Sequence, residues 1–143
     1  MKVKVRSKFE EEIVKGLQAD GIPFEYESLK LKYQKKPAVY TPDLVIGSII
    51  IELKGYFDAE DRAKHLLIKE QYPDLDIRFV FYKSKTKIHK ASLTTYGDWA
   101  SKHGFHHADK EIPEDWIREG LATRGESLGQ YTKKKQVRKN KKS

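Results

Sequence analysis

The stretch from residue 40 to residue 55 constrains the fold of this chain more than any other part. Two apolar runs rich in β-branched residues meet there at a glycine–serine pair that begins with Gly47, and this pattern predicts a β-hairpin. Glu52 and Lys54 interrupt the second run two positions apart, so their side chains leave the same face of the strand. Asp43 lies near the start of the first run, and the hairpin folds it back beside Glu52. The sequence therefore predicts two carboxylates and one amine at one end of a sheet.

These groups suit the metal-assisted cleavage of a phosphodiester bond. Mg²⁺ takes oxygen ligands and is often held by one or two carboxylates together with phosphate and water. The bound metal lowers the pKa of a water molecule and stabilises charge on phosphoryl oxygens, and a lysine beside it can orient the water or neutralise developing charge. The pattern Glu-x-Lys also occurs on solvated strand faces, so an exposed charged face is the alternative. The proline before Asp43 and the apolar surroundings of Glu52 favour a functional site.

Length and composition indicate a single soluble domain. The chain has 143 residues, enough for one hydrophobic core and too few for two. It has no apolar run long enough to cross a membrane, and the charged start is not followed by the apolar stretch of a signal peptide. Cysteine is absent, which excludes disulfides, thiolate zinc sites and cysteine nucleophiles. We therefore expect a cytoplasmic protein, in the bacterial host cytoplasm if the gene belongs to a phage.

The positive charge is concentrated at the C-terminal end. The chain has 29 Lys and Arg residues against 21 Asp and Glu residues, and residues 133–143 contain seven of the basic residues and no acid. Without those seven, 22 basic residues face 21 acidic ones. Such a tail is expected to be disordered and to bind a phosphate backbone by releasing counterions, with Lys133, Lys134 and Lys135 as candidate contacts. The alternative is a segment that only increases solubility.

Hydrophobic periodicity predicts an alternation of helices and strands. The expected elements are a helix over residues 7–20, a strand over 22–27 that continues through 29–33, the hairpin, a helix from Asp58 to about residue 71, a strand over 76–82, a helix from Thr94 or Thr95 to about residue 103, and a short turn over 112–117.

Glu10 has two interpretations. Ser7 and Glu10 have the spacing of a capping box, in which the Glu10 carboxylate would bond to the backbone amide of Ser7. Alternatively, Glu10 faces the carboxylates of the hairpin from the first helical turn and acts as a further metal ligand. The spacing alone favours the cap.

Several longer segments resemble one known family. They are residues 21–27, 40–43, 52–55, 61–71, 73–78, 95–98, 102–104, 108–110 and 112–117. In these segments the chain resembles the phage endonuclease I family, the Holliday-junction resolvases of the T-odd coliphages. Its Pro-Asp and Glu-x-Lys motifs are also those of the wider PD-(D/E)xK nuclease superfamily. The resemblance extends over roughly residues 7–118, far beyond the short nuclease motif.

This resemblance implies a fold and an assembly. The expected fold is α/β, with a restriction-endonuclease-like central mixed sheet flanked by helices, in a homodimer that exchanges segments. The nuclease domain would span residues 1–118, with a linker at 34–39 that joins the exchanged segments, and residues 119–143 would form the basic tail. The linker is shorter than in the family, and because it contains Pro37 we expect it to resist folding back.

The resemblance also implies an active site. Its catalytic residues would be Glu10, Asp43, Glu52 and Lys54. Two Mg²⁺ ions, or Mn²⁺ in their place, would be bound by Asp43 and Glu52, with the Leu53 carbonyl assisting. Glu10 would help to hold the second ion, acting on the other subunit of the dimer. Lys54 would position water or stabilise the transition state.

The expected substrate is branched DNA, which is recognised by its shape and backbone path because a branch point has no fixed sequence. Candidate phosphate contacts are Arg62, Lys64 and His65 in the second predicted helix and Lys83, Lys85 and Lys87 after the strand over residues 76–82. Taken singly, each lysine could equally belong to a solvated loop. Two other functions remain open, which are a non-catalytic basic protein that binds branched DNA and a sequence-directed nuclease with the same metal site.

Overall fold

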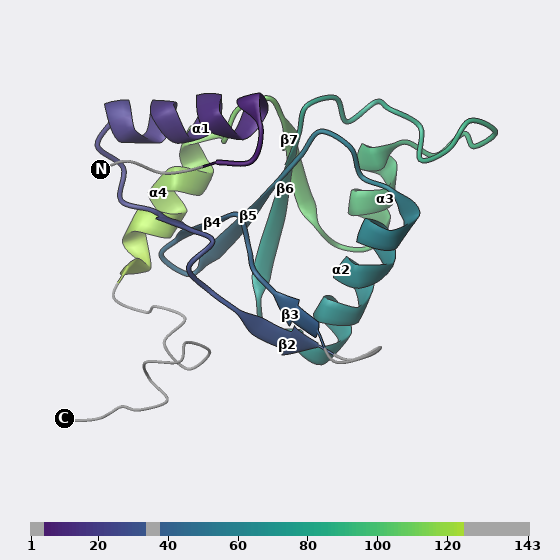
Figure 1. Cartoon of the computed structure of the whole chain (residues 1–143), viewed down its shortest axis with the longest axis horizontal. Coiled ribbons are helices and arrows are strands. Elements are labelled where there is room, and N and C mark those ends of the chain that lie inside the picture. The colour runs from purple at the N-terminus through teal and green to yellow at the C-terminus, as the bar shows by residue number, and fades with distance from the viewer. Residues whose placement is uncertain (1–4, 34–37, 125–143) are drawn as a thin grey trace.

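A mixed β-sheet forms the centre of the protein in the computed structural model, which describes residues 5–33 and 38–124 (Figure 1). The sheet has five strands in the order β1-β4-β5-β6-β7, and β2 and β3 form a separate two-stranded ribbon. The described elements, in chain order, are α1 (Lys8–Ala19), β1 (Glu25–Tyr26), β2 (Leu31–Tyr33), β3 (Ala38–Tyr40), β4 (Leu44–Ile46), β5 (Ile49–Lys54), α2 (Ala59–Gln71), β6 (Asp76–Phe81), α3 (Tyr96–Lys102), β7 (His106–Asp109) and α4 (Glu114–Ala122).

The predicted hairpin lies within this sheet. β4 and β5 pair antiparallel, with Leu44 opposite Ile51 and Ile46 opposite Ile49. Gly47 makes the turn, because its φ of 61° lies in the left-handed region that glycine adopts without strain. β5 pairs in parallel with β6, and β6 with β7, so each of these pairs needs a crossover connection, which contains α2 and α3 respectively. The expected α/β class with a mixed sheet flanked by helices is confirmed.

The alternation of side chains along β5 divides the hydrophobic core into two layers. Ile49 and Ile51 pack in the cluster that contains residues of α1 and α4, whereas Ile50 packs in the cluster that contains residues of α2 and α3. Figure 1 shows α1 and α4 on one side of the sheet and α2 and α3 on the other. Glu52 and Lys54 share the face of Ile50, so both side chains point toward α2.

The helix starts agree with the sequence prediction. Ser7, Asp58 and Thr95 are the N-caps of α1, α2 and α3, and each side chain accepts a hydrogen bond of 2.9 to 3.1 Å from the backbone amide three residues later. These bonds satisfy amides that have no partner inside the helix, which is why short polar residues mark helix starts.

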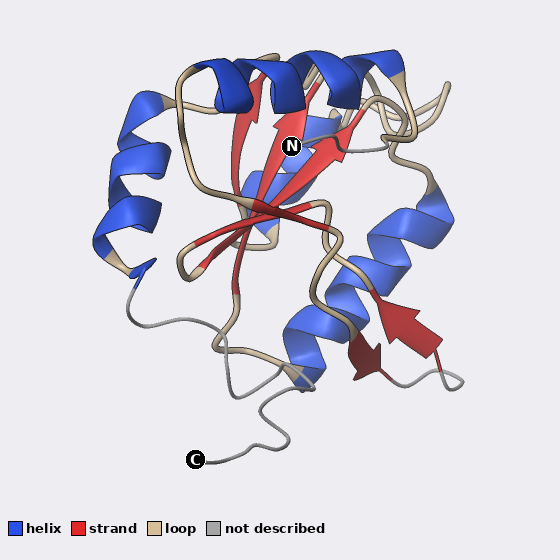
Figure 2. Ribbon diagram, turned by 60° about the vertical axis from the view of Figure 1, so that its left-hand side comes forward, coloured by secondary structure: helices blue, strands red, loops and turns tan. Residues whose placement is uncertain are grey.

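The strands agree less well with the sequence prediction. The strand expected over residues 22–27 is only the two-residue β1, and β3 includes residues that were expected in the linker. β7 was not expected, because its sequence His-His-Ala-Asp lacks the alternating apolar pattern of a strand. Its pairing with β6 creates it, with Val80 opposite Ala108. Figure 2 shows the β2–β3 ribbon beside α2 and apart from the main sheet.

The C-terminal helix extends further than expected. α4 continues to Ala122 in place of the short turn over residues 112–117. Gly120 is buried in it, and any β-carbon there would lie 2.6 Å from the side chain of Ile46. Thr123 accepts a hydrogen bond from the backbone amide of Ser48 at 3.0 Å. The packed part of the chain therefore passes residue 118, because the absent side chain of Gly120 lets α4 approach the hairpin closely.

Two predicted segments lie outside the described residues. They are most of the linker, residues 34–37, and residues 125–143, which include Lys133, Lys134 and Lys135. In the described part of the chain, no helix combines the length and the apolar composition needed to cross a membrane.

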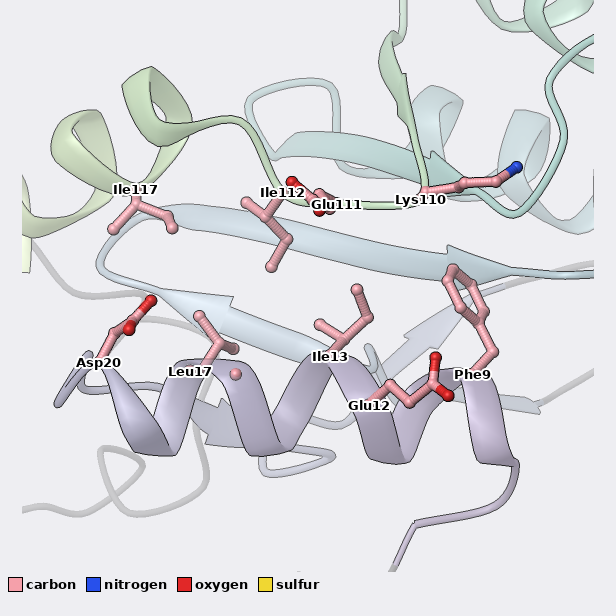
Figure 3. A pocket seen from close by; sticks show the side chains of 10 residues that line it. Phe9, Glu12, Ile13, Leu17, Asp20, Lys110, Glu111, Ile112 and Ile117 are labelled. Carbon is pink, nitrogen blue, oxygen red and sulfur yellow. The ribbon is translucent and has the colours of Figure 1, made fainter.

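A groove separates α1 from the connection between β7 and α4 (Figure 3). The apolar side chains of Phe9, Ile13 and Leu17 line it from α1, and Ile112 and Ile117 line it from the opposite side. Its volume is about 410 Å³. The outer part of the apolar face of α1 therefore does not close completely against its own chain.

Candidate active site

The β4–β5 pairing places Asp43 opposite Glu52. Leu44 pairs with Ile51, so the residues on either side of that pair also face each other across the antiparallel ladder. The Asp43 side chain is buried, and its Oδ2 accepts a hydrogen bond of 2.8 Å from the backbone amide of Leu53. The hairpin thus orients Asp43, as the sequence predicted.

Glu52 is also buried and has a defined orientation. The hydroxyl of Tyr40 donates a hydrogen bond of 2.6 Å to its Oε2. The other oxygen, Oε1, lies 3.7 Å from the Nζ atom of Lys54 and 3.9 Å from the Nε2 atom of His65. Lys54 in turn lies 3.5 Å from Oδ2 of Asp61 on α2. The structure therefore brings Asp43, Glu52 and Lys54 together.

Burial and charge shift the pKa values of these groups. Burial raises the pKa of Asp43, and the neighbouring Glu52 carboxylate adds to that rise. Burial alone would lower the pKa of Lys54, but the carboxylates of Glu52, Asp61 and Asp43 outweigh it and raise the pKa. Lys54 therefore stays protonated at neutral pH, beside two buried carboxylates whose mutual repulsion another cation would relieve.

The capping box predicted at the start of α1 forms only in part, through the side chain of Ser7. Ser7 caps α1, but the Glu10 carboxylate accepts hydrogen bonds from the backbone amide of Arg6 at 3.2 Å and from the hydroxyl of Tyr26 at 2.6 Å. The side chain of Arg6 lies between Glu10 and Asp43, with its Nη2 atom 3.5 Å from Glu10 Oε2 and 2.6 Å from Asp43 Oδ1. Within one chain, the guanidinium of Arg6 therefore connects the Glu10 carboxylate to that of Asp43.

The donor atoms fit a hard divalent cation in part. Asp43 and Glu52 offer carboxylate oxygens, the ligands that Mg²⁺ prefers. In the part of the chain that the structure describes, no three His, Cys, Asp or Glu side chains are grouped closely enough to hold a metal. Glu10 does not join Asp43 and Glu52 directly, because the guanidinium of Arg6 lies between Glu10 and Asp43. A positive group already occupies the space between those two carboxylates.

Three residues of the second predicted helix were candidates for phosphate contacts. His65 is fully buried against Tyr40 and Phe79, so the prediction that it contacts DNA is wrong. Its position on the inner face of α2 explains the error. Arg62 donates a hydrogen bond to the carbonyl of Phe57 at 2.7 Å, which makes it part of the α2 start. Lys64 is half-buried beside Asp61, with 3.8 Å between Nζ and Oδ1.

The lysines after β6 are exposed but do not form one row. Lys83, Lys85 and Lys87 are all exposed. The backbone turns here, because the amide of Thr86 donates a hydrogen bond to the carbonyl of Lys83 at 3.2 Å. The extended conformation that would align the three lysines is therefore not adopted, although each remains accessible.

Three further residues belong to the site and were not among the predicted site residues. They are Arg6, Tyr40 and Asp61. The bond from Arg6 to Asp43 spans 37 residues and the bond from Tyr40 to Glu52 spans 12. Of these three residues, the sequence could have indicated Tyr40, because it lies at the start of the hairpin segment. Neither spacing nor periodicity indicates which distant polar side chain will contact a buried carboxylate.

Comparisons with known proteins assign the chain to a family. The sequence model described as phage endonuclease I matches residues 1–138 of the chain. "Endonuclease I" of Escherichia phage T7 is 48% identical over 117 residues, which are 80% of this chain and 78% of that protein. "Endodeoxyribonuclease 1" of Enterobacteria phage T3 is 43% identical over 138 residues, 94% of this chain and 90% of that protein. The chain, with Asp43, Glu52 and Lys54 gathered at one end of its mixed sheet, therefore belongs to the phage endonuclease I family.

Proposed function

We propose that this protein is a metal-dependent DNA endonuclease that resolves Holliday junctions and other branched DNA. The observation that carries the proposal is the grouping of two buried carboxylates, Asp43 and Glu52, with the protonated amine of Lys54. Membership of the family supports it, since a relative that is similar over nearly the whole chain is named an endodeoxyribonuclease.

The metal of this proposal is Mg²⁺, for which Mn²⁺ can substitute. Asp43, Glu52 and the Leu53 carbonyl would hold it, and Glu10 would assist at a second ion. When bound, the metal supplies an activated water and neutralises charge on the phosphoryl group. The chain provides the orientation, because the Leu53 amide and the Tyr40 hydroxyl hold the two carboxylates in place.

Lys54 has a separate role in this proposal. The amine is almost buried and lies between Glu52 and Asp61, so its charge is poorly screened by water. A charge in such a place stabilises negative charge that develops on a phosphoryl oxygen more than an exposed charge does. The ion pair with Asp61 on α2 limits the positions that the amine can take.

The proposed active unit is a homodimer that exchanges segments, with a restriction-endonuclease-like fold in each half. Two sites related by a two-fold axis can nick two strands of a four-way junction during one binding event. The linker predicted at residues 34–39 would join the exchanged segments, as the resemblance to the family implies. Lys64, the exposed lysines 83, 85 and 87, and the basic tail are the proposed contacts to phosphates.

The test uses a synthetic four-way DNA junction and a linear duplex with the same arm sequences, each with and without Mg²⁺. We expect paired nicks near the branch point, only with metal, and slow cleavage of the duplex. Asp43→Asn and Glu52→Gln should lose cleavage and still bind the junction in a gel-shift assay. Tight binding without cleavage in Mg²⁺ or Mn²⁺ would refute the enzyme and leave a DNA-binding protein. Equal cleavage of the duplex would refute selectivity for junctions.

A further inference from the structure

The guanidinium of Arg6 is surrounded by carboxylates. Its Nη2 atom lies 2.6 Å from Asp43 Oδ1 and 3.5 Å from Glu10 Oε2, and its Nε atom lies 2.9 Å from Glu27 Oε2. Asp43 and Glu10 come from elements that are far apart in the sequence, and a single nitrogen of Arg6 contacts both. Such an arrangement is what a bound cation requires from its ligands.

The two sides of this contact differ in their exposure. Asp43 and Glu10 are buried, with side-chain exposures of 2% and 7%, whereas the side chain of Arg6 is 65% exposed. Arginine stays charged at every pH at which the protein is folded. A buried carboxylate that loses its partner suffers a large desolvation penalty, but the guanidinium can move into water at little cost. Arg6 is therefore the replaceable member of the cluster.

A divalent cation at this place would need the oxygen atoms that Arg6 now occupies. Asp43 Oδ2 is already bonded to the Leu53 amide, so Oδ1, the atom that Arg6 contacts, is the oxygen left to face a ligand. Glu10 Oε1 likewise receives hydrogen bonds from Tyr26 and from the Arg6 backbone, and Oε2 faces the guanidinium. The guanidinium and a metal ion therefore compete for the same oxygens.

We propose that Arg6 is the resident counter-ion of the metal site, which occupies the place between Asp43 and Glu10 in the metal-free protein and is displaced when a divalent cation binds. This inference rests on the metal-dependent function proposed above. Arg6 keeps the buried carboxylates neutralised while no metal is present, and it lowers the affinity of the site for metal. Because Arg6 directly precedes the Ser7 cap of α1, it stays beside Glu10 even if that helix is exchanged between subunits.

The inference predicts the metal affinity of Arg6 variants without DNA. Arg6→Ala and Arg6→Gln in the full chain, titrated with Mg²⁺ by isothermal calorimetry, should bind the ion about tenfold more tightly than the unchanged protein, which corresponds to about 1.4 kcal/mol. Arg6→Gln retains hydrogen-bond donors for the buried carboxylates, so it serves if Arg6→Ala folds poorly. As a second readout, Mg²⁺ should raise the Tm of either variant more than it raises that of the unchanged protein.

Lys15→Ala is the matched control, because it removes one positive charge from α1 without touching the cluster. Lys15 is exposed, and its described ion pair is with Glu11 on the same helix. Its Mg²⁺ affinity should change by less than about twofold. A similar increase in this control would show a general effect of charge and overturn the displacement.

The remaining outcomes separate this inference from the proposed function. If the unchanged protein and both Arg6 variants bind Mg²⁺ equally well, Arg6 does not compete and the inference is wrong, while the metal site stands. If the variants bind more weakly, Arg6 supports the metal site, and the inference is again wrong. If neither the unchanged protein nor the variants bind Mg²⁺ or Mn²⁺, the metal-dependent function fails and the inference fails with it.

Discussion

Lys54 shows how a single side chain depends on its buried neighbours. Its Nζ atom lies 3.7 Å from Glu52 and 3.5 Å from Asp61, and these carboxylates keep it protonated. We expect Lys54→Met to lower the rate of junction cleavage by about 10²–10³-fold, the usual loss when one group that stabilises transition-state charge is removed. Single-turnover cleavage at saturating enzyme measures the change. Lys69→Met removes an exposed lysine that packs over Phe105 and should leave the rate unchanged.

Junction affinity is the companion measurement for this variant. A Lys54→Met protein that cleaves at the normal rate would contradict a role in the reaction. A variant that loses cleavage only because it no longer binds DNA would show that Lys54 acts in binding instead.

His65 predicts a dependence of stability on pH. Neither ring nitrogen has a hydrogen-bond partner among the described residues, and burial, with the charges of Lys54 and Lys64, lowers its pKa well below the ordinary value of 6.5. Below pH 6.5 the unfolded chain therefore binds a proton at His65 that the folded protein excludes. The free energy of unfolding then decreases as the pH falls. Urea unfolding without metal, between pH 7 and pH 5, should show a decline that is smaller in His65→Phe. Equal declines would contradict a buried neutral His65.

At the level of elements, the turn between β4 and β5 depends on Gly47. Its φ is 61°, and a β-carbon at this position would collide with the backbone carbonyl of Gly120 in α4. We expect Gly47→Ala to lower the free energy of unfolding by about 1–3 kcal/mol through backbone strain and overpacking. Chemical denaturation at one pH measures the change.

Gly16 is the matched control for this substitution. It lies inside α1, and a β-carbon there would have no neighbour within 4 Å. Gly16→Ala should stabilise the protein by about 0.5–1 kcal/mol, because alanine favours the helix more than glycine. If both substitutions changed the stability equally, the close approach of α4 to the hairpin would not be what limits residue 47.

At the level of the whole molecule, the charge of the tail predicts how DNA binding responds to salt. Residues 133–143 hold seven of the 29 Lys and Arg residues. Replacing Lys133, Lys134 and Lys135 with glutamine should weaken junction and duplex binding alike, because contacts to phosphates carry no sequence information. The slope of log K against log salt should decrease by up to about 0.9 for each phosphate that the tail no longer neutralises. The rate of cleavage by the variant at saturating enzyme should not change. An unchanged salt slope would indicate a tail that only increases solubility.

The sequence by itself determined the local geometry of this protein. The two-residue period of a strand places Glu52 and Lys54 on one face, the glycine marks the turn, and Ser7, Asp58 and Thr95 mark the helix starts. These features depend on interactions between residues a few positions apart, so they can be predicted without knowing the rest of the fold. The family resemblance, which the comparisons confirm, comes from the same kind of information.

Only the tertiary structure decided what surrounds these groups. It brings Arg6 to Asp43, Tyr40 to Glu52 and Asp61 to Lys54, and it buries His65, which the sequence had placed among the contacts to DNA. It also makes a strand of the polar segment β7, by pairing it with β6. Burial and long-range pairing depend on how the elements pack together, and the pKa values of ionisable groups shift with that packing. The residues of the site could therefore be predicted from periodicity, whereas their partners and protonation required the folded chain.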